Sequence, residues 1–261
     1  MKVVIDFDSR GDTVYGKFAP GEGALPRTTA LLVPGFPGSE DDVLGLAGSL
    51  SQRGINVLFF NYRGTYRSEG PFALAGSLED IGAAMEYLRR ESVVRRFQVE
   101  PSRIVLGGYS HGGGLSLIYA AAHPEIQRVF SIAGNDFGEF AREYRRDSAA
   151  AAALDKVFRE LEAPSGPVRY GDEVPPGPLL EDPDPYDLRL HAPALADRDL
   201  LLVGGWDDHQ VTIEHYVLPL YRALCEAGAE HVRIEALQDD HSFANSRRDL
   251  ADLLAEWVTR P

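Results

Sequence analysis

Ser110 lies in the run Gly108-Tyr109-Ser110-His111-Gly112, a G-x-S-x-G pattern that can present a serine hydroxyl as a nucleophile. The apolar segment 103–107 before it predicts a buried strand, and segment 113–120 after it predicts a helix. Glycine on both sides permits the tight turn that pushes the hydroxyl out at the end of the sheet. The bare pattern is weak in a chain with 26 glycines. In this strand-turn-helix context it predicts that Ser110 is a nucleophile.

His241 is the predicted base, because a serine hydroxyl needs a proton acceptor to attack at neutral pH. It follows the last predicted strand and precedes the final helix, which places it on the same edge of a parallel sheet as Ser110. His111 neighbours the serine, and we expect its backbone N–H rather than its ring to contribute. The other histidines have weaker contexts: His123 before a proline, His191 near the end of an insertion, and His215 and His231 in or beside helical segments.

The imidazole in turn needs a carboxylate that fixes its tautomer and stabilises its charged form. Asp208 follows a predicted strand, and the spacing Gly205-x-x-Asp208-x-x-Val211 favours it over Asp207. The order Ser110, Asp208, His241 along the chain is the nucleophile-acid-base order of one hydrolase fold. Asp136, after the preceding strand, is the alternative acid. Asp239 and Asp240 lie too close in sequence to His241 to reach its far nitrogen, so they are expected to shape the loop.

These residues require a scaffold, and strand-like and helix-like segments alternate along most of the chain. This alternation predicts an α/β protein with a mostly parallel twisted sheet and helices on both faces. The first twenty residues read as a hairpin of edge strands. Helices are expected from Ser39 to Gly54, from Ser77 onward, over Ile213–Ala227 and over Phe243–Val258. Core strands are expected at Ala30–Val33, Val57–Asn61, Ile104–Gly107, Arg128–Ile132, Leu200–Gly204 and Val232–Leu237.

The segment 136–196 interrupts the alternation and lacks a strong strand. Ser148–Glu162 reads as a helix, and the next twenty-five residues are rich in proline, glycine and acid. The segment lies between two core strands and so emerges near their carboxyl ends, where ligands bind in open α/β sheets. We predict a small cap over the active site, within one domain that spans residues 1–261; a loose linker is the alternative.

Composition narrows the functional classes. Hydrophobic residues make up 44% and charged residues 25% of 261 residues, typical of a soluble globular protein. The net charge of −14 argues against nucleic acid or an anionic membrane as partner. No signal-like or membrane-spanning apolar run is apparent, so a cytoplasmic protein is expected. The lone Cys225 excludes an internal disulfide and is expected to be buried packing. A homodimer is compatible with the sequence, which does not fix the oligomeric state.

Nearly the whole chain resembles the α/β-hydrolase-fold serine hydrolases, in particular compact bacterial enzymes akin to dienelactone hydrolase and prolyl-oligopeptidase-like catalytic domains. Segment 33–38 corresponds to the family's oxyanion loop, with Pro34 where the family has histidine. The resemblance implies that the backbone N–H groups of Phe36 and His111 form the oxyanion hole. Segment 61–70 resembles the family's Arg-Gly-x-x-x-Ser-x-Gly loop.

The resemblance implies a carboxylic-ester hydrolase that works through an acyl-enzyme on Ser110, without metal or cofactor. Small to medium acyl esters are the expected substrates, and Tyr109, Trp206 and Phe137 are expected to line an apolar acyl pocket unless they belong to the core. His209 and His215 lack the further ligands of a metal site. The alternatives are a peptidase of the aminopeptidase or acylaminoacyl type, which shares the triad, and a non-catalytic protein that binds a small ligand under the cap.

Overall fold

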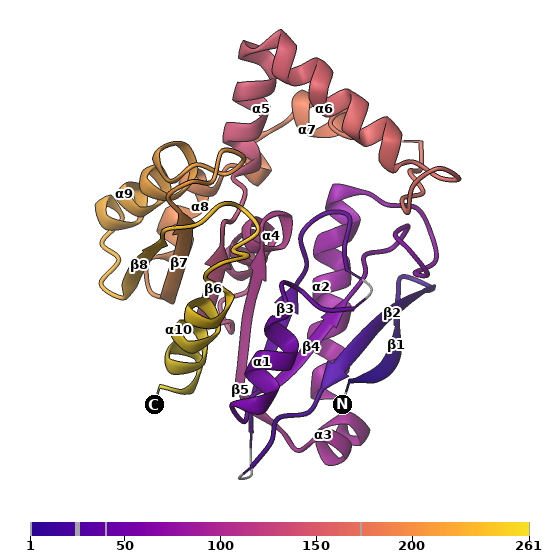
Figure 1. Cartoon of the computed structure of the whole chain (residues 1–261), viewed down its shortest axis with the longest axis vertical. Coiled ribbons are helices and arrows are strands. Elements are labelled where there is room, and N and C mark those ends of the chain that lie inside the picture. Colours follow the sequence, from indigo (N-terminus) through magenta and orange to yellow (C-terminus); the bar gives the residue numbers. More distant parts are fainter. Residues whose placement is uncertain (1, 24–26, 40, 173, 261) are drawn as a thin grey trace.

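The computed structural model describes residues 2–23, 27–39, 41–172 and 174–260. Eight strands form one sheet in the order β1-β2-β4-β3-β5-β6-β7-β8 (Figure 1). The six strands from β4 to β8 along the sheet are parallel, which confirms the predicted fold class. The strands are β1 (Val3–Ser9), β2 (Asp12–Ala19), β3 (Arg27–Val33), β4 (Asn56–Phe60), β5 (Val99–Tyr109), β6 (Arg128–Ile132), β7 (Asp199–Gly205) and β8 (Val232–Leu237).

The N-terminal hairpin is present as predicted. β1 pairs antiparallel with β2 through a tight connection at Arg10 and Gly11, both at positive φ. β2 continues antiparallel onto β4, so the hairpin extends the parallel core on one side. The structure therefore contains each of the predicted core strands, and β5 begins earlier, at Val99.

Helices cover both faces of the sheet and divide the core in two (Figure 1). On one face, Trp257 is fully buried and its ring packs against that of Phe130. On the other face, Phe18 stacks on Phe97. The first face carries α1 (Leu46–Gln52) and α10 (Arg247–Thr259), and the second carries α2 (Leu74–Arg89), α3 (Glu91–Phe97), α4 (His111–Ala122), α8 (Leu188–Leu195) and α9 (Leu218–Glu226).

The first core helix begins later than its sequence pattern predicts. The Asp42 carboxylate accepts hydrogen bonds from the N–H groups of Ala47 and Gly48, at 2.8 and 2.9 Å, and so caps α1 from the preceding turn. Ser39 belongs to that turn rather than to the helix, and its hydroxyl donates to the Asp42 carbonyl. Ser39 and Asp42, which suggested a helix start, therefore lie in the turn before α1, and Asp42 caps the N-terminus of that helix.

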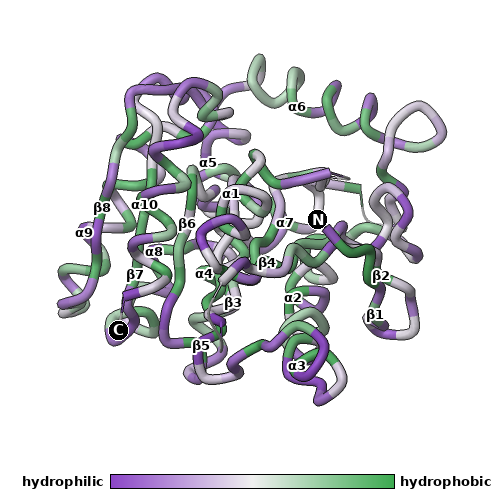
Figure 2. Tube along the Cα trace, turned by 60° about the horizontal axis from the view of Figure 1, so that its bottom comes forward, coloured by the Kyte–Doolittle hydropathy of each residue, from purple (hydrophilic) through white to green (hydrophobic). Residues whose placement is uncertain are grey.

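The cap consists of α5 (Phe137–Arg146), α6 (Ser148–Leu161) and α7 (Gly177–Glu181). α6 stands clear of the sheet (Figure 2). The structure describes all fourteen residues of α6, and none of them is buried. Residues 188–196, which were expected in the cap, instead form α8 and its end in the body of the molecule. The reason is that Leu188, Ala192 and Leu195 are buried, and α8 packs against α4 and α9.

The far end of the cap is fastened to the body by backbone hydrogen bonds. The Phe72 N–H donates to the Arg169 carbonyl, and the Arg169 N–H donates to the Gly64 carbonyl, both at 2.7 Å. Val168 forms a bridge with Thr65, and the Arg169 guanidinium reaches carbonyl groups of the same loop. The segment that follows α6 is thus joined to the body at residues 168 and 169.

Two expectations concern the surface. In the part of the chain that the structure describes, no helix is long and apolar enough to cross a membrane. Cys225, expected as buried packing, is exposed. α9 turns Leu220 and Leu224 toward the core, and a residue that directly follows Leu224 faces outward on a helix.

Candidate active site

Ser110 sits at the sharp turn between β5 and α4 with φ 53° and ψ −119°, a conformation that non-glycine residues rarely adopt. Glycine is required on both sides because the backbones approach closely. A Cβ on Gly108 would lie 2.4 Å from the Gly112 backbone, and one on Gly112 would lie 2.4 Å from the Pro34 carbonyl oxygen. The turn therefore has the geometry of a nucleophile elbow, which exposes the Ser110 hydroxyl at the carboxyl end of the sheet.

The three predicted triad residues lie in one hydrogen-bonded chain. The Ser110 hydroxyl donates to Nε2 of His241 at 3.0 Å, and Nδ1 of His241 donates to Oδ2 of Asp208 at 2.7 Å. These residues follow β5, β8 and β7, which lie in one half of the sheet with β6 between β5 and β7. The carboxylate holds the proton on Nδ1 and leaves Nε2 free to accept the serine proton, as nucleophilic attack requires.

Asp208 is held in place by its own loop. Its Oδ1 accepts hydrogen bonds from the N–H groups of Gln210 and Val211, at 2.8 and 2.9 Å. Burial alone raises the pKa of Asp208, but the hydrogen bonds from His241 and from these amides outweigh burial and lower that pKa below its usual value. Asp207, the neighbouring alternative, is exposed and accepts from Gln238 instead.

The loop that carries His241 is shaped by acids, as its sequence suggested. Asp239 accepts hydrogen bonds from the Ser246 N–H and hydroxyl and from the Asn245 N–H, each at 2.8 Å. Burial raises the pKa of Asp239, and these hydrogen bonds more than offset it, so that the pKa falls to about 2. Asp240 accepts from the Ser242 N–H and hydroxyl. This turn also explains why α10 begins at Arg247 rather than at Phe243.

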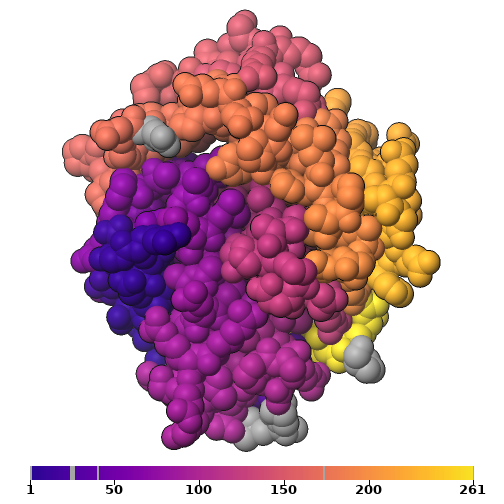
Figure 3. Space-filling model, turned by 180° about the vertical axis from the view of Figure 1, so that it is seen from behind, coloured from indigo at the N-terminus to yellow at the C-terminus, as the bar shows by residue number. Residues whose placement is uncertain are grey.

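Above Ser110 and below the cap lies a cavity of about 750 Å³. Seen from behind, an opening lies between the cap and the body (Figure 3). The cavity spans the carboxyl ends of several strands. Because Ser110 follows β5, in the middle of the sheet, lining residues fall on either side of it. Over β3 and β4 lies an aromatic lobe, lined by Phe36, Phe72, Ala73, Leu74, Ala75 and Phe158; over β6 and β7 lies a polar lobe, lined by Glu143, His209, Gln210, Val211 and Tyr216.

Phe137, one of the three expected pocket residues, lines the cavity. Tyr109 and Trp206 lie outside it. The Tyr109 hydroxyl donates to the His241 carbonyl at 3.0 Å, and its ring packs against the imidazole at 5.1 Å, so Tyr109 supports the loop that carries His241. Trp206 is 57% exposed because it immediately follows β7, two residues before the buried Asp208, and faces solvent.

Phe36 and His111, the expected oxyanion residues, both line the cavity beside Ser110. The His111 ring packs among aromatic rings, at 5.0 Å from Phe137, 5.5 Å from Tyr62 and 5.7 Å from Phe36. Its burial lowers the pKa of His111 to about 3, so the imidazole is neutral at physiological pH. Sequence reasoning assigned only the backbone of His111; the side chain adds an uncharged wall to the aromatic lobe.

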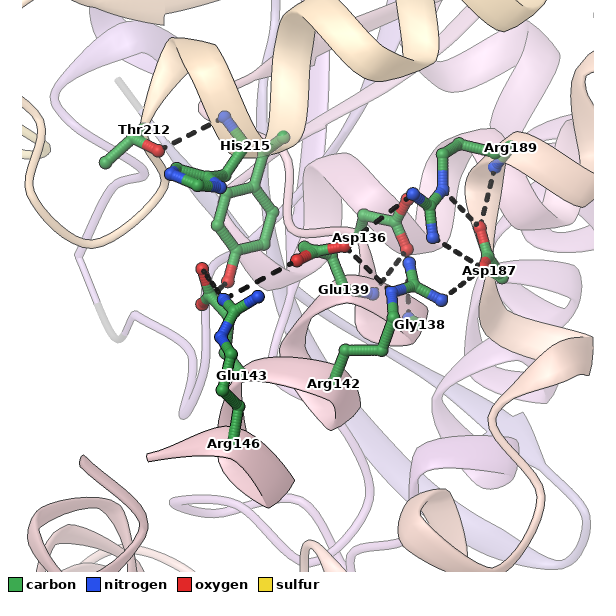
Figure 4. A network of polar contacts seen from close by, with 11 residues as sticks. Asp136, Gly138, Glu139, Arg142, Glu143, Arg146, Asp187, Arg189, Thr212 and His215 are labelled. Atoms are coloured by element: carbon green, nitrogen blue, oxygen red, sulfur yellow. Dashed lines mark hydrogen bonds and ion pairs between the residues drawn. The ribbon is translucent and has the colours of Figure 1, made fainter. Parts of the chain in front are cut away.

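Asp136, the alternative acid, does not contact His241. It caps α5 by accepting hydrogen bonds from the N–H groups of Gly138 and Glu139 (Figure 4). Burial and the neighbouring charge of Asp187 raise the pKa of Asp136 to about 6. Asp136 therefore stabilises the N-terminus of α5, where the cap begins.

We expect Asp136→Asn to stabilise the protein at alkaline pH. Asparagine caps a helix as well as aspartate does, so the variant keeps the cap and loses the charge. The folded-state pKa of about 6 lies above the value of 3.8 for an unperturbed carboxyl, so wild-type stability falls as the pH rises between these values. The variant lacks this loss of stability, so its free energy of unfolding at pH 8 should exceed that of the wild type by about 1–2 kcal/mol.

Asp147→Asn is the matched control, because Asp147 caps α6 through the same kind of bonds at an exposed site. Thermal melts of both variants from pH 4 to pH 8 measure the difference. The gain of Asp136→Asn should shrink toward pH 4. Equal, pH-independent effects of the two substitutions would contradict the role of burial.

One group near the cavity has the composition of a metal site. Ligand atoms of Glu139, Glu143 and His215 lie within 4.8 Å of one another. Guanidinium groups already neutralise this cluster: Arg142 contacts Glu139 at 2.8 Å, and Arg189 lies 3.7 Å from the same carboxylate. Their positive charges oppose a metal ion, and we assign none to this cluster.

The sequence model of the alpha/beta hydrolase fold family matches residues 30–174. The protein YfhR of Salmonella typhi is 33% identical over 205 residues, which cover 77% of this chain and 62% of YfhR. The chain therefore spans less than two thirds of that relative.

Two solved structures are similar over almost the whole chain. The esterase domain of a Rhodothermus marinus protein has a TM-score of 0.65 at 20% identity and covers 98% of this chain and 97% of its own. The acylaminoacyl peptidase of Pyrococcus horikoshii has a TM-score of 0.71 at 18% identity, over 100% of this chain and 41% of its own. At these identities the likeness shows the fold.

Proposed function

This chain belongs to the alpha/beta hydrolase fold family, and from that premise we propose that it is a serine hydrolase that cleaves carboxylic esters through an acyl-enzyme on Ser110. The observation that carries the proposal is the hydrogen-bonded chain from Ser110 through His241 to Asp208 on the floor of the cavity below the cap. A serine without a catalytic role would not require a strained backbone, a base and a buried acid that orients the base, all in one place.

In the proposed reaction, His241 takes the Ser110 proton as Oγ attacks the ester carbonyl. The negative charge that develops on the carbonyl oxygen is stabilised by the N–H groups of Phe36 and His111. His241 then gives the proton to the leaving alkoxide, and the C–O bond of the ester breaks. Water, activated by the same imidazole, releases the acid from Ser110.

The test is labelling of the purified protein with a fluorescent fluorophosphonate, followed by hydrolysis of p-nitrophenyl esters. Labelling that is lost in His241→Ala would support the proposal. Failure of the wild type to label would favour the non-catalytic binding protein. Parallel assays with aminoacyl-p-nitroanilides distinguish an esterase from the peptidase alternative.

The aromatic lobe is proposed as the acyl site, because the leaving group must lie on the other side of Ser110, near His241. Phe158 of α6 closes this lobe, with its ring 6.2 Å from that of Phe36. Each methylene of an acyl chain that is buried there gains up to about 0.8 kcal/mol. The rate constant kcat/KM should therefore rise from acetate to hexanoate esters.

We expect Phe158→Ala to reduce this chain-length preference. The preference for p-nitrophenyl hexanoate over acetate should fall by roughly tenfold, because the lobe loses an aromatic wall. Lys156→Ala is the matched control on the same helix, since Lys156 is exposed and pairs with Glu160 outside the cavity. An unchanged preference in Phe158→Ala would place the acyl group elsewhere.

A further inference from the structure

The polar lobe is the place for the leaving group of the proposed reaction. His241 must deliver a proton from Nε2 to the leaving oxygen, so the alcohol portion of the ester has to lie on the His241 side of Ser110. That side of the cavity lies over β6 and β7 and is lined by the polar lobe. The side chains of this lobe therefore determine which alcohols are accepted.

The charges that line the cavity have one sign. Among the described residues that line it, the charged ones are Glu143 and Asp182, and neither lysine nor arginine occurs. Asp182 is exposed at the end of α7. Glu143 projects from α5 into the polar lobe. A positively charged group is thus favoured here, and an anionic one is opposed.

The neighbouring carboxylates form close ion pairs with guanidinium groups, whereas the Glu143 carboxylate does not (Figure 4). Asp187 pairs with Arg142 at 2.7 Å and with Arg189 at 3.1 Å, and both arginines also approach Glu139. Among the described residues, the only guanidinium that pairs with Glu143 is that of Arg146, at 3.9 Å, and a ring nitrogen of His215 lies within 4.8 Å of the carboxylate. The Arg146 side chain is 65% exposed, and water screens its charge.

The Glu143 carboxylate is also held in a fixed position. Its Oε2 accepts a hydrogen bond of 2.5 Å from the hydroxyl of Tyr216, which is buried. Burial of Tyr216, together with this hydrogen bond, raises the pKa of the phenol well above its usual value, so the hydroxyl remains a donor. Oε1 lies on the side of the exposed Arg146, where its charge can attract a cation. The site costs little reorganisation when a cation binds.

We propose that Glu143 selects esters whose leaving alcohol carries a positive charge, such as amino-alcohol esters, and binds their ammonium group in the polar lobe. This inference rests on the proposed esterase function. Ser110 Oγ forms a bond to the carbonyl carbon, the bond from that carbon to the alcohol oxygen breaks, and the alcohol oxygen receives the proton from His241. The ammonium group takes no part in the bond changes; Glu143 only binds it.

A metal ion is the other cation that this corner of the cavity suggests. Glu139 and His215 approach Glu143 closely enough to share an ion. The guanidinium groups on Glu139 favour an organic ammonium at Glu143 over a metal shared by all three residues. Assays with and without EDTA distinguish the two.

The experiment compares two butyrate esters of the same shape. Butyrylcholine carries a quaternary ammonium, and 3,3-dimethylbutyl butyrate has a neutral carbon in its place. Wild-type kcat/KM should be about fivefold higher for the cationic ester than for the neutral one at low salt. Salt at about 0.5 M should lower this ratio, because it screens a partly exposed ion pair. A ratio of one or less overturns the inference.

Variants then test the residue. Glu143→Gln should lower the ratio to about one, and Tyr216→Phe should lower it in part, because the carboxylate loses its fixed position. Glu160→Gln on α6, outside the cavity, is the matched control and should keep the wild-type ratio. A ratio that survives in Glu143→Gln, or one that EDTA abolishes, overturns the assignment. If wild type hydrolyses p-nitrophenyl butyrate but neither of these esters, the inference fails; if it hydrolyses none of the three, the proposed function itself fails.

Discussion

Ser110→Ala is expected to lower kcat/KM for p-nitrophenyl butyrate by roughly 10⁴- to 10⁶-fold, the largest effect of any single substitution. Without the hydroxyl no acyl-enzyme forms, and what remains is binding and oxyanion stabilisation. Alanine has a Cβ like serine, so the strain at φ 53° is the same in both proteins. The loss should therefore appear in activity and not in the melting temperature.

Ser242→Ala provides the matched control. Ser242 is a half-buried serine next to His241, and its hydroxyl donates to Asp240 rather than to the imidazole. Its loss should change kcat/KM by less than about twofold, as for most surface substitutions. Mass spectrometry of the fluorophosphonate adduct should locate the label on Ser110. A label on Ser242, or an active Ser110→Ala, would refute the nucleophile assignment.

Asp208→Asn is expected to lower kcat by about 10⁴-fold with little effect on the fold. The amide oxygen can still accept from Gln210 and Val211, so the loop keeps its shape. The amide nitrogen then faces Nδ1 of His241 and donates to it, which moves the imidazole proton to Nε2. An imidazole with its proton on Nε2 cannot accept the Ser110 proton.

Asp207→Asn separates tautomer control from loss of charge. The two aspartates are adjacent, but Asp207 is exposed and bonds to Gln238 outside the triad. We expect this variant to retain kcat within about twofold. Comparable losses in the two variants, measured with p-nitrophenyl butyrate, would show that the charge of the loop matters and the hydrogen bond to His241 does not.

The placement of the triad could be predicted because each residue sits at a strand end that is visible in the sequence. Ser110 lies between an apolar strand and a glycine-rich helix, and Asp208 and His241 each follow an apolar strand. Parallel strands bring their carboxyl ends to one edge, so local patterns sufficed to place residues from 33 to 131 positions apart.

The lining of the cavity could not be predicted, because it depends on the path of the cap. Tyr109 and Trp206 are near the triad in sequence yet face away from the cavity, whereas Phe158 and Glu143 are far from it in sequence and line it. Their approach depends on backbone bonds such as that from Phe72 to Arg169, between two irregular segments. Irregular pairings of this kind leave no periodic pattern in the sequence.

The absence of buried residues in α6, among its fourteen described positions, has a consequence for how this protein can change over evolutionary time. Substitutions that destabilise a protein strongly are mostly those of buried side chains, and surface changes are usually within about 0.5 kcal/mol. The positions of α6 that line the cavity can therefore be exchanged with little loss of stability. New substrate ranges are accessible through this helix while the sheet and the triad beneath it stay unchanged.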